Sequence, residues 1–117
     1  FISKENPEIL LPYVHILIEY IDYRANRVKW GCPESLGNIA RKYPSNVERA
    51  IPKLLKNLND KSTVVRWCAA YALTEIAKYN TQKQKELTTK FQTLINTEQN
   101  NGVKNLYVKA LKEIEKQ

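Results

Sequence analysis

The sequence has 117 residues, of which 43% are hydrophobic and 26% are charged, a balance typical of one folded domain. The longest apolar stretch, residues 9–21, is interrupted by Pro12, His15 and Glu19, which excludes a membrane span, and no signal peptide precedes it. The net charge of +7 favours an acidic partner, either nucleic acid or an acidic protein, although ordinary solubility charge also explains it.

No methionine occurs, at the first position or elsewhere, so we expect a fragment, a processed product or a trimmed form of a chain, and the sequence leaves open whether further repeats precede residue 1. The lack of a span or signal peptide favours a cytoplasmic protein. Cys32 and Cys68 lie in helical patterns beside small residues, which favours buried thiols over a disulfide or a metal site. A single histidine leaves too few ligands for zinc, and we expect no metal and no cofactor.

Three pairs of amphipathic helices are predicted, because the chain resembles itself when it is shifted by 37 and then by 38 residues. Each copy has a valine followed by a basic residue, with a leucine and an isoleucine eight and eleven positions after the valine. This spacing places the apolar side chains near one face of a helix. The copies are Val28/Leu36/Ile39, Val65/Leu73/Ile76 and Val103/Leu111/Ile114, and the pairs cover approximately residues 6–43, 46–79 and 81–116.

The first pair contains prolines in both of its predicted helices. Asn6 and Pro7 signal the start of the first helix, and Pro12 lies inside it. Gly31 and Pro33 fall in the second helix. That helix is therefore either kinked or begins late, with the proline in its first turn.

The second and third pairs repeat this plan with changes. Asn46 signals the start of the second pair, and Pro52 matches the earlier proline at a shift of 40, which indicates a kink that belongs to the unit. The third pair starts at Thr81, lacks the proline and has Asn105 where the others have tryptophan; the run Asn100-Asn101-Gly102 signals the end of its first helix. Its polar end, residues 113–117, favours a capping repeat at the C-terminus.

The second pair resembles a HEAT repeat. It has a first helix with an internal proline and Leu-Leu, an aspartate at the turn, then Val-Arg followed by Ala-Leu-x-x-Ile-Ala. The resemblance extends over about residues 6–116 and implies an all-α fold, a right-handed superhelix of about three hairpins in a single domain, residues 1–117. It also implies that the first helices line the convex side and the second helices the concave side. It says little about function.

A helical wheel of the second helix in the second pair separates a core face from an opposite face. The core face contains Val65, Ala69, Ala72, Leu73 and Ile76. On or beside the opposite face lie Trp67, Tyr71, Thr74 and Lys78.

The equivalent positions of all three pairs define candidate binding residues on the concave surface. These are Trp30, Glu34, Arg41, Trp67, Tyr71, Lys78, Lys109 and Lys112. Exposed tryptophan, tyrosine and arginine dominate binding hot spots. The alternative is that the tryptophans pack between repeats, in which case burial of both indoles would exclude a binding role.

Arg66, Asp60 and His15 are expected to have structural roles. The HEAT resemblance implies that Arg66 pairs with the turn residue Asp60 in a ladder along the repeats, and His15 is expected to be a structural histidine. No nucleophile, phosphate loop or metal motif is present, so we expect no enzymatic activity. Glu34 resembles the concave carboxylate of HEAT-like alkylpurine DNA glycosylases, but their Trp-Asp arrangement is absent.

These features lead to a protein-interaction module that binds an acidic protein segment on the concave face. The alternative is a nucleic-acid-binding module, in which Arg and Lys contact phosphates and Trp and Tyr stack on bases. A third possibility is a structural fragment whose binding residues lie in repeats not present here.

Overall fold

The computed structural model describes residues 37–117 of the chain. The greater part of the first predicted pair, including Trp30, Cys32 and Glu34, lies outside these residues. Residues 37–40 are helical and are followed by the 3-10 helix η3 (Pro44–Ala50) and four α-helices, with no strand in the described part of the chain. The all-α fold class is confirmed. The α-helices are α4 (Ile51–Asn57), α5 (Thr63–Tyr79), α6 (Thr81–Thr97) and α7 (Asn101–Glu115).

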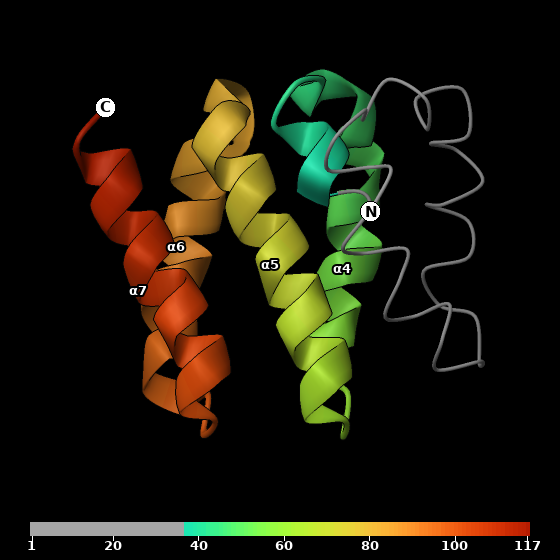
Figure 1. Ribbon diagram of the computed structural model, residues 1–117, viewed down its shortest axis with the longest axis vertical. Coiled ribbons are helices and arrows are strands. Elements are labelled where there is room, and N and C mark those ends of the chain that lie inside the picture. The colour runs from blue at the N-terminus through green and yellow to red at the C-terminus, as the bar shows by residue number, and fades with distance from the viewer. Residues whose placement is uncertain (1–36) are drawn as a thin grey trace.

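The helices form two hairpins that stack side by side (Figure 1). Helix α4 pairs with α5, and α6 pairs with α7. In Figure 1 the second helices, α5 and α7, run in the same direction in front of α4 and α6. Helix α5 contacts α4, α6 and α7, so it is the centre of the described structure.

Polar side chains fix the starts of the long helices. Ser62 accepts a hydrogen bond from the main-chain N–H of Val65 at the start of α5, and Asn80 and Asn100 cap α6 and α7 in the same way. The cap at Asn100 explains one departure from the sequence prediction. Helix α6 already ends at Thr97, and the Asn101–Gly102 segment, predicted to end a helix, instead begins α7.

Two prolines shape the first helix of the second pair. Pro44 occupies the first turn of η3, so this helix begins two residues before the predicted start. The main-chain N–H of Ile51 donates to the carbonyl of Glu48, a 3-10 type bond, and Pro52 follows in the first turn of α4. Because proline has no N–H to donate, Pro52 lies where the 3-10 helix gives way to the α-helix.

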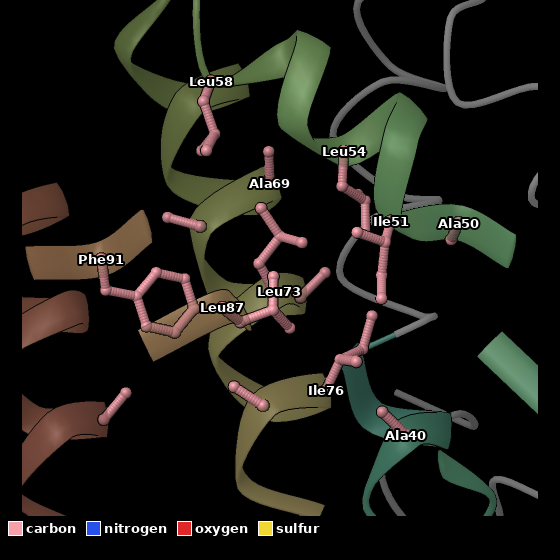
Figure 2. Packing of buried hydrophobic residues seen from close by; sticks show 14 of the residues in the cluster. Ala40, Ala50, Ile51, Leu54, Leu58, Ala69, Leu73, Ile76, Leu87 and Phe91 are labelled. Carbon is pink, nitrogen blue, oxygen red and sulfur yellow. The ribbon is translucent and has the colours of Figure 1, made fainter. Parts of the chain in front are cut away.

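The hydrophobic core lies between the two layers (Figure 2). Ile51 and Leu54 from α4, and Leu87 and Phe91 from α6, point toward Leu73 of α5. Burial of each large side chain stabilises the fold by roughly 1.5–3 kcal/mol. The predicted core face of α5 is confirmed, because Val65, Ala69, Ala72, Leu73 and Ile76 are all fully buried.

Gly37 allows the end of the preceding helix to approach α5 closely. A Cβ atom at this position would lie 3.0 Å from the Cα of Ala72 and 3.0 Å from the ring of Tyr71. This distance is shorter than ordinary van der Waals contact. The glycine therefore sets the spacing between the last part of the first pair and the second pair.

Candidate interaction surface

An aromatic pair lies on the exposed part of α5. Trp67 and Tyr71 are one helical turn apart, and their rings stack with centroids 5.5 Å apart and an interplanar angle of 5°. Trp67 is 36% exposed, and Val64, on the same side of the helix, is 47% exposed. The indole of Trp67 is therefore not buried between repeats. Trp30, the other predicted indole, lies outside the described residues.

Tyr71 is held in place by the preceding repeat. Its hydroxyl donates a hydrogen bond of 2.8 Å to the side-chain oxygen of Asn38. Thr74, predicted beside the exposed face, is instead buried, and its hydroxyl donates to the main-chain oxygen of Tyr71. Of the predicted residues of α5, only Trp67 and Tyr71 thus offer aromatic surface, in the N-terminal half of the helix, while Tyr79 at its C-terminal end is also 40% exposed.

A chain of ion pairs crosses the C-terminal half of the same layer. The buried carboxylate of Glu75, whose side chain is 4% exposed, lies 3.1 Å from Nη2 of Arg41 and 3.1 Å from Nζ of Lys78. The same Nζ lies 3.0 Å from Oε2 of Glu113 on α7. The network therefore joins the end of the first pair, α5 and α7.

These contacts change the protonation behaviour of the two cations. Burial alone lowers the pKa of Lys78, but hydrogen bonds to Glu113 and Glu75 outweigh it, and the pKa is raised overall. The hydrogen bond to Glu75 likewise raises the pKa of Arg41. Two cations face two carboxylates here, so Arg41 and Lys78 add little net charge to the surface.

Lys109 and Lys112 of α7 stand apart from this network. Both side chains are exposed, and within residues 37–117 neither has an ion pair. The structure describes six of the eight predicted residues and divides them into three groups. Trp67 and Tyr71 form one cluster, Arg41 and Lys78 belong to a structural network, and the two lysines of α7 carry the unbalanced charge.

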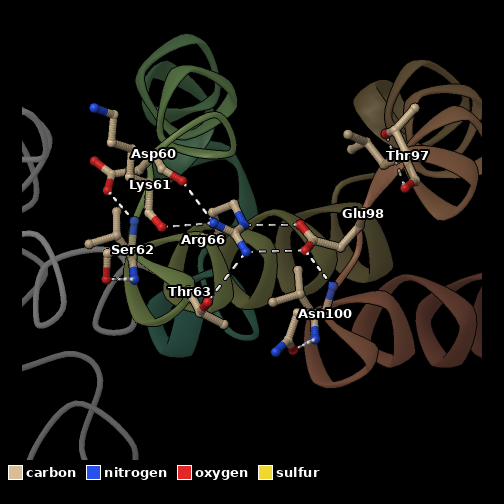
Figure 3. A network of polar contacts seen from close by, with 11 residues as sticks. Asp60, Lys61, Ser62, Thr63, Arg66, Thr97, Glu98 and Asn100 are labelled. Carbon is tan, nitrogen blue, oxygen red and sulfur yellow. Dashed lines mark hydrogen bonds and ion pairs between the residues drawn. The ribbon is translucent and has the colours of Figure 1, made fainter.

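Arg66 forms a second link between repeats, at the opposite end of α5 (Figure 3). Its Nη1 donates to the main-chain oxygens of Asp60 (2.9 Å) and Lys61 (3.1 Å), and its Nη2 donates to the hydroxyl of Thr63 (3.3 Å). Its Nε lies 3.2 Å from the carboxylate of Glu98, in the turn between α6 and α7. The carboxylate partner of Arg66 in this contact comes from the next repeat.

Asp60 supports this link through its main chain and orders the turn with its side chain. Its Oδ1 accepts a hydrogen bond of 2.9 Å from the N–H of Ser62. A cavity of about 330 Å³ lies between the two turns and is lined by Asp60, Arg66, Leu58, Leu94 and Glu98, among others. Because the guanidinium group faces protein acceptors on several sides, the cavity offers little free positive charge to a ligand.

Sequence reasoning missed the acidic partners Glu75, Glu98 and Glu113. Glutamate is rarely buried, so a helical pattern alone does not indicate a buried Glu75. One signal was present, because Glu75 and Glu113 coincide at the shift of 38 that aligns the second and third pairs.

In the part of the chain that the structure describes, no three His, Cys, Asp or Glu residues form a potential metal site. None of its helices has the length and hydropathy needed to cross a membrane.

Comparison with known families gives one match. Residues 34–117 match the family model of Cnd1, non-SMC mitotic condensation complex subunit 1. This range includes both described hairpins and the end of the first pair. No curated protein and no solved structure matches the chain.

Proposed function

Since this chain belongs to the Cnd1 family, non-SMC mitotic condensation complex subunit 1, we propose that it is a non-enzymatic scaffold that binds a protein segment. The binding surface is the layer of second helices, and the segment is acidic. The helical pairs are HEAT-type repeats of a single domain. In place of the cytoplasmic location expected from the sequence, the family description favours action on chromosomes in mitosis.

The observation that carries this proposal is the partly exposed indole of Trp67, which stacks on the half-buried ring of Tyr71. Tryptophan and tyrosine combine a large apolar area with few rotatable bonds, and they are enriched where binding energy is concentrated. Val64 extends the apolar area along α5. A partner that covered these side chains would remove apolar surface from water.

The charged residues support a scaffold in another way. Glu75 and Glu98 are almost fully buried side chains that bind cations from other helices. Their contacts connect consecutive repeats at both ends of α5. A surface held on rigid neighbouring helices presents its side chains with little loss of conformational entropy on binding.

Photo-crosslinking tests which layer binds the partner. A photoreactive phenylalanine analogue is placed at Asn105, in the layer of second helices, or at Lys85, on the exposed side of α6, in the full chain expressed in dividing cells. We expect protein crosslinks from position 105 during mitosis and few from position 85. Protein crosslinks from position 85 alone would contradict the proposal. Crosslinks from position 105 to nucleic acid alone would establish the alternative function.

A further inference from the structure

The surface of the second helices is divided into an apolar part and a basic part. Val64 and Trp67 provide exposed apolar area on α5, and Lys109 and Lys112 provide unbalanced positive charge on α7. The charge predicted on α5 is absent from this surface, because Lys78 is balanced by two carboxylates. Aromatic and basic features therefore lie on different helices.

The repeat register gives the separation between these two parts. The shift of 38 aligns Asn105 of α7 with Trp67 of α5, and it aligns Lys109, one helical turn further along, with Tyr71. Packed helices have axes about 8–10 Å apart, and one turn rises about 5.4 Å. The path from the indole to the first free lysine is thus roughly 10–11 Å.

An extended chain advances about 3.3 Å per residue, so this path corresponds to roughly three or four residues. We infer that the surface binds an extended protein segment with one apolar side chain and an Asp or Glu three or four positions away, lying across α5 and α7. The apolar side chain covers Trp67, and the carboxylate meets Lys109 or Lys112. This inference rests on the proposed function and adds the sequence pattern of the partner.

The distribution of charge favours a discrete carboxylate over a nucleic-acid backbone. A phosphodiester chain carries a charge at every nucleotide and is bound by a continuous series of cations. Here the two lysines are followed by Glu113, which is exposed and lies within the same helix. A protein segment with a single acidic position matches two lysines without facing this carboxylate.

The test is a selection of random peptides of about twelve residues, displayed on phage, against the full chain at moderate salt. The same selection is run on W67A and on the charge-reversed variant K109E/K112E, each checked for helical content by circular dichroism. We expect enriched peptides to share an apolar residue and an acidic residue three or four positions apart. On K109E/K112E the acidic position should become Lys or Arg, while the apolar position is kept.

The outcomes separate this inference from the proposed function. Peptides that lose about tenfold or more of their binding to W67A and K109E/K112E, but show no preferred spacing, would overturn the inference and leave the binding face intact. Peptides that bind both variants as well as the wild type would overturn the binding face itself. No enrichment on any version of the chain would overturn both.

Discussion

Glu75 connects the second helices of neighbouring repeats through a buried carboxylate. A buried carboxylate loses its hydration, and this loss is offset only when cations and hydrogen-bond donors surround it. Arg41 and Lys78 supply these groups from two repeats. Lys78 also forms an ion pair with Glu113 of the next repeat. The same position in a single isolated hairpin would lack the arginine.

The substitution E75Q tests this role. Glutamine keeps the shape of the side chain but loses its charge, so Arg41 and Lys78 lose a carboxylate partner. We expect the free energy of unfolding in urea to fall by about 1.5–3 kcal/mol. K85Q, which alters an exposed lysine without an ion pair in residues 37–117, should change it by less than about 0.5 kcal/mol. Equal effects of the two substitutions would contradict a structural role for Glu75.

The buried hydroxyl group of Tyr107 makes the free energy of unfolding depend on pH in the alkaline range. Burial raises the pKa of its hydroxyl group above the ordinary 10.0, and the negative charge of Glu98 raises it further. The folded state therefore keeps a proton that the unfolded state loses. The contribution of this hydroxyl group to the free energy of unfolding should be constant below pH 10. It should fall as the pH rises above 10.

The same sign applies to Lys78, whose pKa is also raised. Urea unfolding at pH 8 and at about pH 11 measures the combined loss. Y107F removes the phenol, so its stability should depend less on pH in this range than that of the wild type. A Y107F variant with the full pH dependence would show that Tyr107 is not responsible.

The residues that could be predicted are those whose role follows from helical periodicity. Val65, Leu73 and Ile76 recur at fixed spacing, and the structure buries all three. The state of Lys78 could not be predicted, because it depends on Glu75 and on Glu113 from another helix. Periodicity gives the face of a helix on which a charge lies, but not the charges that neighbouring helices bring to it.

At the scale of elements, the approach of residues 37–40 to α5 depends on the absence of a side chain at Gly37. G37V would place methyl groups against the backbone of Ala72, where there is no room for them. We expect a loss of about 1–3 kcal/mol in the free energy of unfolding, as is usual for overpacked cores. The control Q92A changes an exposed side chain of α6 and should have little effect. A G37V variant as stable as the control would show that residue 37 and Ala72 are not closely packed.

Helix boundaries depend on local capping, which the sequence predicts at one helix start and leaves ambiguous at another. The start of α6 at Thr81 follows from local capping and could be predicted from the sequence. At Asn100 the sequence pattern predicts the end of a helix, because asparagine is frequent both at helix starts and in turns. Its side-chain bond to the N–H of Val103 decides between them.

In the molecule as a whole, the distribution of net charge and the position of the exposed aromatic side chain favour different faces as the binding surface. The first helices η3, α4 and α6 carry six basic and two acidic residues, a net charge of +4. The second helices α5 and α7 carry five basic and three acidic residues, a net charge of +2. Attraction by charge alone would thus favour the first helices. Binding at the second helices requires the exposed Trp67 together with the lysines of α7.

Two charge-reversed variants with the same net charge show which layer of helices binds the partner. K109E/K112E alters the second helices, and K85E/K90E makes the equal change on α6. The measurement is the recovery, with the full chain from mitotic cells, of the proteins that crosslink to position 105. We predict a loss of about tenfold or more for K109E/K112E and near wild-type recovery for K85E/K90E. Equal losses, or a larger loss for K85E/K90E, would contradict binding at the second helices.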